Sequence, residues 1–264
     1  MNGPIFIGGA PRSGLALLRL MLDGHPAISC GPDVGHVALT MTSSDFESTL
    51  GDLHREHFFL DAEKVRRIFA RAIAAPMEKR AAALGKARWA DKTAFNILVF
   101  ERLAQLFPEA RFLHLVRDGR DLAASLMERQ WRDPSGRLFD QCASLSGAAR
   151  YWASIVTRGL RAEADPSLAG RILRLRYEDL AAQPGETLRQ VCSFIGAAFD
   201  PGMLAIERRQ APLAGLELES ADRLRRPVNA DAIGRWRRDL RQEDAAALYA
   251  AHRPLFEALG YRAI

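Results

Sequence analysis

The chain has 264 residues, of which 48% are hydrophobic and 26% charged, an ordinary balance for a globular α/β protein with a full core. It contains no run of eighteen apolar residues, so no membrane span is expected, and the first apolar run begins too near residue 1 to leave room for a cleaved signal. The net charge of +5 is compatible with nucleic acid, an anionic membrane or an anionic small ligand. The small ligand is favoured because the arginines are dispersed and no nucleic-acid-binding motif accompanies them, and a merely solvated basic surface is the alternative.

Strands alternate with helices along the chain, which predicts one domain over 1–264 with a parallel sheet covered on both faces. Apolar runs predict strands at 5–7, 27–30, 88–90, 111–117 and 172–177. Helical periodicity or composition predicts helices at 15–22, 61–84, about 100–107, 120–129, about 145–163, 184–195 and 242–259. Loops are expected at 35–60, where a substrate lid is one open role, and at 131–142.

The most informative stretch is GGAPRSG at 8–14, which joins the first strand to the first helix. A strand, a glycine-rich turn and a helix in succession predict a phosphate-binding loop, because backbone N–H groups and the helix N-terminus surround an anion. The glycines have the G-x4-G spacing of a Walker loop, but Leu15 and Ala16 stand where Lys and Ser/Thr belong. The loop thus lacks the lysine for terminal phosphates and the hydroxyl for magnesium, and its cation is Arg12. We therefore expect a phosphorylated ligand bound without a metal.

A second phosphate signal follows the strand at 111–117. Arg117 stands at the end of that strand, and Ser125 and Arg129 lie one helical turn apart on the helix that follows. Two arginines and a hydroxyl at a strand end form a compact phosphate pocket. The alternative for Arg117 is a surface ion pair with Asp118 or Asp121.

Four sequence blocks, in order, resemble the PAPS-dependent sulfotransferases. They are PRSG at 11–14, LVRDGRD at 115–121 with Ser125, RYEDL at 176–180, and RPVN at 226–229 before Trp236. The chain is most similar to the tyrosylprotein sulfotransferases and their bacterial relatives, through Cys30-Gly31-x-acid and the Asp91-Lys92 pair. The resemblance runs from residue 4 to about 260 and is thinner across 35–85 and 130–165.

The resemblance implies a P-loop-containing nucleotide-hydrolase-like fold of three layers, with a central parallel sheet flanked by helices. It also implies 3′-phosphoadenosine-5′-phosphosulfate (PAPS) as the donor, released as PAP. Expected at the 5′-phosphosulfate are Arg12, Ser13, Gly14, the backbone N–H groups of Leu15 and Ala16, and Ser220. Expected at the 3′-phosphate are Arg117, Ser125 and Arg129, with Tyr177 against the nucleotide and Arg226 as a further basic donor contact.

Four residues are implied in catalysis: Asp33 and Lys92, together with Arg12 and Ser220 at the phosphosulfate. Asp33 falls where the family has its catalytic glutamate and is one methylene shorter, and its alternative is a turn or cap aspartate. His36 is the reserve base. Lys92 matches the family lysine at the bridging oxygen, in a chain with only four lysines, and its alternative is an exposed lysine paired with Asp91.

The sequence thus predicts an enzyme that transfers a sulfuryl group from PAPS to a hydroxyl or amine. A P-loop kinase or NTPase is opposed by the missing lysine, while a non-catalytic nucleotide-binding protein stays open because Leu15 and Ala16 replace two family threonines. The expected partner is a small-molecule or peptide acceptor; a homodimer stays open, and no nucleic acid is expected. Three scattered cysteines without metal spacing, Cys30, Cys142 and Cys192, indicate buried thiols and a reducing cytoplasm.

Overall fold

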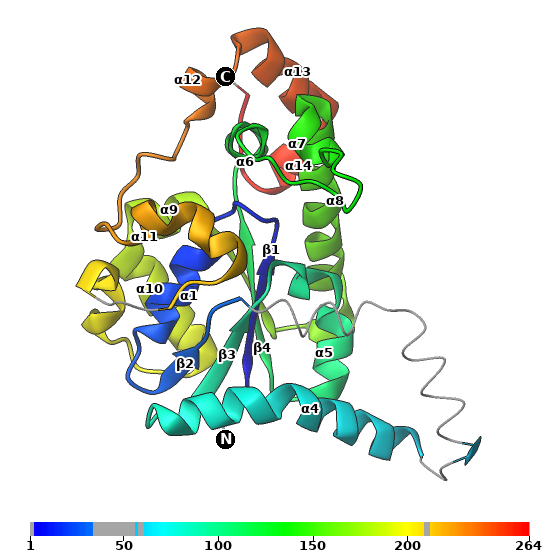
Figure 1. Cartoon of the computed structure of the whole chain (residues 1–264), viewed down its shortest axis with the longest axis vertical. Coiled ribbons are helices and arrows are strands. Elements are labelled where there is room, and N and C mark those ends of the chain that lie inside the picture. Colours follow the sequence, from blue (N-terminus) through cyan, green and yellow to red (C-terminus); the bar gives the residue numbers. More distant parts are fainter. Residues whose placement is uncertain (1–2, 34–55, 58–60, 209–211, 264) are drawn as a thin grey trace.

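The computed structural model describes residues 3–33, 56–57, 61–208 and 212–263. Its centre is a five-stranded parallel sheet in the order β2-β3-β1-β4-β5 (Figure 1). The strands are β1 (Ile5–Gly9), β2 (Ile28–Cys30), β3 (Arg88–Lys92), β4 (Arg111–Val116) and β5 (Ile172–Arg176). All four pairings between adjacent strands are parallel, which confirms the predicted fold class.

The central strand β1 separates two hydrophobic cores. Ile5 and Ile7 face one core, which includes side chains from α1 (Leu15–Asp23) and α10 (Pro184–Ile195). Phe6 faces the other, with side chains from α5 (Phe100–Leu106) and α8 (Leu145–Ala164). Because side chains alternate along a strand, a fully apolar run such as this one is stable only with helices on both faces. Figure 1 shows these two helical layers on opposite sides of the sheet.

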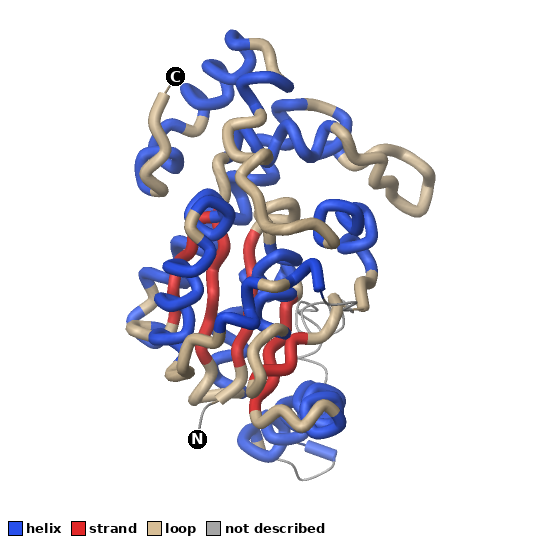
Figure 2. Tube along the Cα trace, turned by 90° about the vertical axis from the view of Figure 1, so that its left-hand side faces the viewer, coloured by secondary structure: helices blue, strands red, loops and turns tan. Residues whose placement is uncertain are grey.

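The remaining helices lie around this three-layer body. Figure 2 shows the strands side by side, with the C-terminal end of the chain beyond one end of the sheet. The other α-helices are α4 (Ala62–Ala83), α6 (Gly119–Met127), α7 (Asp140–Ala143), α9 (Tyr177–Ala182), α11 (Ala221–Leu224), α12 (Trp236–Asp239), α13 (Gln242–Ala251) and α14 (Arg253–Ala258). Short 3₁₀ helices include η1 (Ala94–Leu98), η4 (Ile206–Arg208) and η5 (Gly215–Ser220). In the described part of the chain, no helix is both long and apolar enough to cross a membrane.

Several predicted boundaries are wrong in informative ways. The single helix expected over 242–259 is broken at His252, because Pro254 has no N–H and belongs in a first helical turn. The helix expected over 120–129 ends at Met127, and the loop expected at 131–142 already contains the start of α7. Lys92 lies within β3 instead of after it. His36 and nearly all of the proposed lid at 35–60 lie outside the described residues.

Candidate active site

A cavity of about 930 Å³, its open mouth included, lies where the carboxyl ends of the strands meet. This is the edge at which open α/β sheets place their ligands, and the volume is that of an ordinary ligand pocket. Among the described residues, the lining includes every predicted site residue except Ser13 and Arg129: Arg12, Gly14, Leu15, Ala16, Asp33, Lys92, Arg117, Ser125, Tyr177, Ser220 and Arg226. The structure therefore brings together side chains that lie more than 200 positions apart in the sequence.

Gly14, the last residue of the loop at 8–14, must be glycine for two reasons. Gly14 has φ +91°, in the left-handed region, and a Cβ there would lie 2.4 Å from a ring carbon of Tyr177. The loop thus packs directly against the first residue of α9. Arg12 also has a positive φ, 74°, which is unusual for a residue with a side chain and holds its guanidinium on the cavity side. Leu15, by contrast, packs into the same core cluster as Leu18 while also touching the cavity.

We expect Gly14→Ala to destabilise the fold and to weaken binding of anionic ligands. The matched control is Gly136→Ala, since Gly136 has a similar φ of +84° but nothing within 4 Å of an added Cβ. Both changes carry the backbone cost of a left-handed alanine, roughly 1 kcal/mol, and only Gly14→Ala adds a clash, worth about 1–3 kcal/mol. Urea unfolding of both variants measures the difference. Equal losses in the two would show that Tyr177 does not pack against the loop.

An arginine cluster occupies one end of the cavity. The Nε of Arg12 donates to Ser125 Oγ at 3.2 Å, which joins the residue expected at the 5′-phosphosulfate to one expected at the 3′-phosphate. The pKa of Arg12 is lowered to about 10, chiefly by burial and then by the positive charge of Arg129. The charges of Arg117 and Arg223 lower it further, while the negative charge of Glu219 raises it. Positive charge therefore exceeds negative charge here, as an anion-binding site requires.

Glu219 is the carboxylate of that cluster. It lies 3.8 Å from Arg12 Nη1 and 3.4 Å from Arg129 Nη1, and it accepts a hydrogen bond of 2.6 Å from Trp131 Nε1. Arg129 itself lies just beyond α6 and bonds back to the carbonyl of Ser125 at 3.3 Å. A phosphate entering this end of the cavity would compete with Glu219 for the same two arginines.

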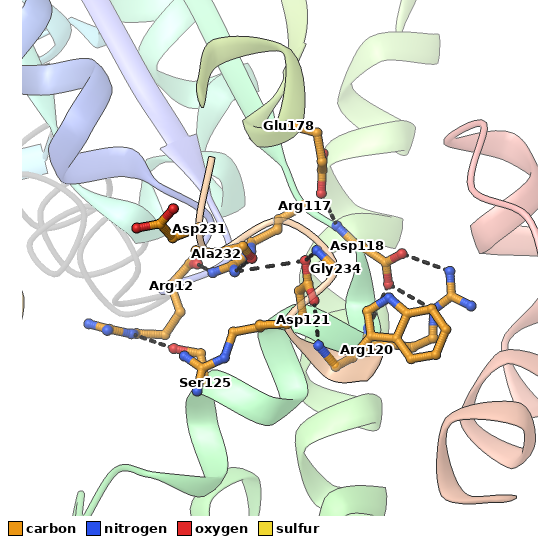
Figure 3. A network of polar contacts seen from close by, with 12 residues as sticks. Arg12, Arg117, Asp118, Arg120, Asp121, Ser125, Glu178, Asp231, Ala232 and Gly234 are labelled. Atoms are coloured by element: carbon orange, nitrogen blue, oxygen red, sulfur yellow. Dashed lines mark hydrogen bonds and ion pairs between the residues drawn. The ribbon is translucent and has the colours of Figure 1, made fainter. Parts of the chain in front are cut away.

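Arg117 connects the loop to a distant segment (Figure 3). Its Nη1 donates to the carbonyl of Arg12 at 2.9 Å and its Nη2 to the carbonyl of Ala232 at 2.6 Å. Its guanidinium also lies over the ring of Tyr177, 4.5 Å from the centroid. Arg117 does form an ion pair with Asp121, at 3.9 Å, but both side chains are buried, 4% and 0% exposed, so the expected surface position of that pair is wrong.

Asp121 fixes the same distant segment from α6. Its two carboxylate oxygens accept from the backbone N–H groups of Gly234, at 2.8 Å, and Trp236, at 2.9 Å. Burial raises the pKa of the Asp121 carboxyl, although these hydrogen bonds act in the opposite direction. With residues 232–236 held in this way, the RPVN block at 226–229 lies along the cavity.

A buried ion network occupies another part of the cavity lining. The Nζ of Lys92 lies 3.0 Å from Asp33 Oδ2 and 2.9 Å from Glu217 Oε1. Lys92 is only 4% exposed, and Asp91 instead accepts from Asn96 at 2.6 Å, so the alternative of an exposed Lys92–Asp91 pair is wrong. The carboxylate of Asp33 thus forms an ion pair with Lys92, which brings the two residues into direct contact on the cavity lining.

Sequence reasoning missed three residues of this site. Two of them are Glu217 and its partner Arg19, which lie 198 positions apart, so no local pattern connects them. A signal was present, because Arg19 is a lone arginine inside the apolar helix at 15–22, and a buried arginine requires a buried partner. Arg223 lines the cavity from α11, a helix of four residues that has no strong periodicity.

Comparisons with known proteins identify the family. A sequence profile described as "Sulfotransferase family" matches residues 4–201. Protein-tyrosine sulfotransferase 1 of Danio rerio is 28% identical over 88% of this chain and 65% of its own length, and protein-tyrosine sulfotransferase A of Caenorhabditis elegans is 28% identical over 97% of this chain and 67% of its own. The chain thus spans about two thirds of the length of these relatives.

The fold has solved counterparts. The sulfotransferase domain of the curacin biosynthetic pathway superposes with a TM-score of 0.71 at 21% identity, covering 100% of this chain and 99% of its own. The sulfotransferase domain of the Synechococcus PCC 7002 olefin synthase gives 0.66 at 20% identity, covering 98% and 95%. With the profile matching most of the chain and the fold shared along its whole length, this protein belongs to the sulfotransferase family.

Proposed function

We propose that the protein transfers a sulfuryl group from PAPS to a hydroxyl or amine acceptor and releases PAP. The observation that carries this proposal is one cavity whose lining includes both an arginine cluster and the Lys92–Asp33 pair. The arginine cluster suits the phosphates of a nucleotide, and the Lys92–Asp33 pair suits a reacting centre that gains negative charge and loses a proton.

The residues present fit a donor with two phosphate groups. Ser13 Oγ is buried and has no hydrogen-bond partner among the described residues, so a polar atom of the loop is left for a ligand. Arg12, Arg117, Arg129 and Ser125 would hold the phosphates, and Arg223 and Arg226 add positive charge along the same wall. Leu15 and Ala16 contribute their backbone N–H groups alone, since neither side chain has a donor.

When bound, the donor supplies an electrophilic sulfur with the nucleotide as leaving group. We assign Asp33 the role of general base, which takes the proton of the acceptor as its oxygen or nitrogen bonds to sulfur. We assign Lys92 to the oxygen that leaves with the nucleotide, where its charge stabilises the transition state. Arg12 and Ser220 complete the set around the phosphosulfate.

The formal charges of the ion network support these roles. Lys92 and Arg19 carry two positive charges, and Asp33 and Glu217 carry two negative ones, so the network is neutral while Asp33 is ionised. Protonation of Asp33 leaves a net charge of +1 beside the leaving group, at the moment when that group gains negative charge. Proton transfer and charge stabilisation are thereby coupled.

The acceptor class and the conditions of the reaction are also proposals. The curated relatives are named for protein tyrosine, so a phenolic hydroxyl on a peptide or small molecule is the first class to test.

We propose metal-independent transfer, because Ala16 provides no hydroxyl for magnesium. All three cysteines are buried and unpaired, which supports the cytoplasm as the compartment.

Thermal unfolding with two ligands tests the donor assignment. At 100 times its dissociation constant, a ligand adds roughly 2.7 kcal/mol of stability. PAP is expected to raise the melting temperature, while magnesium-ATP is not. A shift with magnesium-ATP and none with PAP would replace the proposal with that of a P-loop kinase or NTPase.

A further inference from the structure

Glu217 is the most deeply buried carboxylate of the cavity. Its side chain is 1% exposed, and both of its oxygens accept from Arg19, at 3.2 Å from Nε and 2.7 Å from Nη2. Arg19 is itself fully buried on α1, and its Nη2 also donates to the carbonyl of Pro212 at 2.8 Å. The paired hydrogen bonds fix the carboxylate in one orientation, with Oε1 against Lys92.

The surroundings of Glu217 oppose a role as the base. Burial alone would raise the pKa of its carboxyl, but the hydrogen bond from Arg19 and the charges of Lys92 and Arg19 outweigh burial and lower it. A carboxylate whose oxygens are held by an arginine does not readily accept a proton. Its charge is therefore constant, whereas the charge of Asp33 changes during the proposed reaction.

Lys92 needs such a constant partner. A lysine side chain has a flexible stem and a single point charge, so its position depends on the anions around it. Once Asp33 takes a proton, its attraction for the ammonium group falls, and Glu217 is the remaining carboxylate within 4 Å among the described residues. Without Glu217, the ammonium group would be free to move at the stage when the leaving oxygen requires it.

We propose that Glu217, anchored by Arg19, is a positioning residue that holds the Lys92 ammonium group in place throughout turnover. The inference rests on the proposed sulfuryl transfer and adds two residues to it. Glu217 reaches the site from η5, so this short helix connects the reaction centre at Lys92 with the arginine cluster at Glu219.

A double-mutant cycle in kcat tests the proposal. We expect Glu217→Gln to lower kcat by about 10- to 100-fold when Lys92 is present and by less than about threefold in the Lys92→Ala background, because a residue that acts through Lys92 has no effect without it. The dissociation constant of PAP, measured by calorimetry, is expected to stay within about threefold of the wild type. The matched control is Glu163→Gln, which weakens the pair between Glu163 on α8 and His114 on β4, outside the cavity lining, and is expected to leave kcat unchanged.

A second variant covers the case in which Glu217→Gln fails to fold with Arg19 left unpaired. The double change Arg19→Met with Glu217→Gln removes both charges, which proteins tolerate better than the loss of one. The effect of this double change on kcat is then measured with Lys92 present and in the Lys92→Ala background. Equal losses of kcat with and without Lys92, or full kcat in the variant, would overturn the proposal.

A readout independent of turnover separates this inference from the proposed function. The chain has only four lysines, so acetylation at each is resolved by mass spectrometry. Relative to the exposed Lys79, Lys92 is expected to react faster in the Glu217 variants and at the wild-type rate in Glu163→Gln. An unchanged Lys92 rate would overturn the positioning role even if PAPS is turned over. A wild-type protein without turnover would refute the proposed function, while the acetylation rates would still decide the role of Glu217.

Discussion

Lys92→Ala is expected to lower kcat by about 10²-fold or more, with little change in the dissociation constant of PAP. The ammonium group is 4% exposed and held between two carboxylates at 3.0 and 2.9 Å, so it has one fixed position in the cavity. A charge fixed in a site that excludes water stabilises a developing negative charge without reorganisation. Because the effect concerns the transition state, kcat and kcat/KM should fall together.

Steady-state kinetics and calorimetry of the variant measure the two quantities. Lys79→Ala is the control, since Lys79 is exposed on α4 and is not among the residues that line the cavity. The removal of Lys92 leaves Glu217 paired with Arg19, so the fold has no unpaired buried carboxylate there. A loss confined to the KM of the donor would mean that Lys92 binds the nucleotide and does not act on the reacting atoms.

Arg12→Ala is expected to weaken PAP binding by roughly 10- to 100-fold, since a hydrogen bond to a charged group contributes about 1.5–3 kcal/mol. Arg12 is the only cation of the loop and the centre of the arginine cluster, hydrogen-bonded to Ser125 and next to Arg129. The substitution adds little backbone strain, because alanine and arginine disfavour the left-handed conformation at φ 74° equally.

Isothermal calorimetry with PAP measures this loss. Arg137→Ala is the control, since the Arg137 side chain is 85% exposed in the loop between α6 and α7 and its loss changes the net charge equally. Raising the salt concentration would reduce a general charge effect in both variants but not the specific loss at Arg12. Wild-type affinity in Arg12→Ala would show that the loop does not hold the donor.

Local signals in the sequence predicted most of the fold and the two expected phosphate regions. The strand–turn–helix at 5–22 and the strand ending at Arg117 each occupy a continuous stretch, and the parallel sheet brings their ends together in the predicted way. Boundaries that depend on a few backbone hydrogen bonds, such as the break at His252, were less predictable.

The contacts that sequence reasoning missed are long-range ones. Glu217 lies in a stretch without regular periodicity, and its partner Arg19 is revealed only by the packing of η5 against α1. The same holds for Arg117, whose hydrogen bond to the carbonyl of Ala232 depends on a backbone atom that no sequence pattern marks. Residue type predicted which side chains have suitable chemistry, and tertiary packing decided which of them meet.

The most direct test of the proposed function is the transfer of labelled sulfuryl from PAPS to an acceptor by the wild-type chain. A panel of phenols, tyrosine-containing peptides, sugars and amines covers the acceptor classes, with Lys92→Ala as the control protein. The account predicts label in an acceptor, an equal amount of PAP, and a rate lower by about 10²-fold or more in the control. Binding of PAP without labelled product from any acceptor would contradict it and identify the chain as a nucleotide-binding protein without transferase activity.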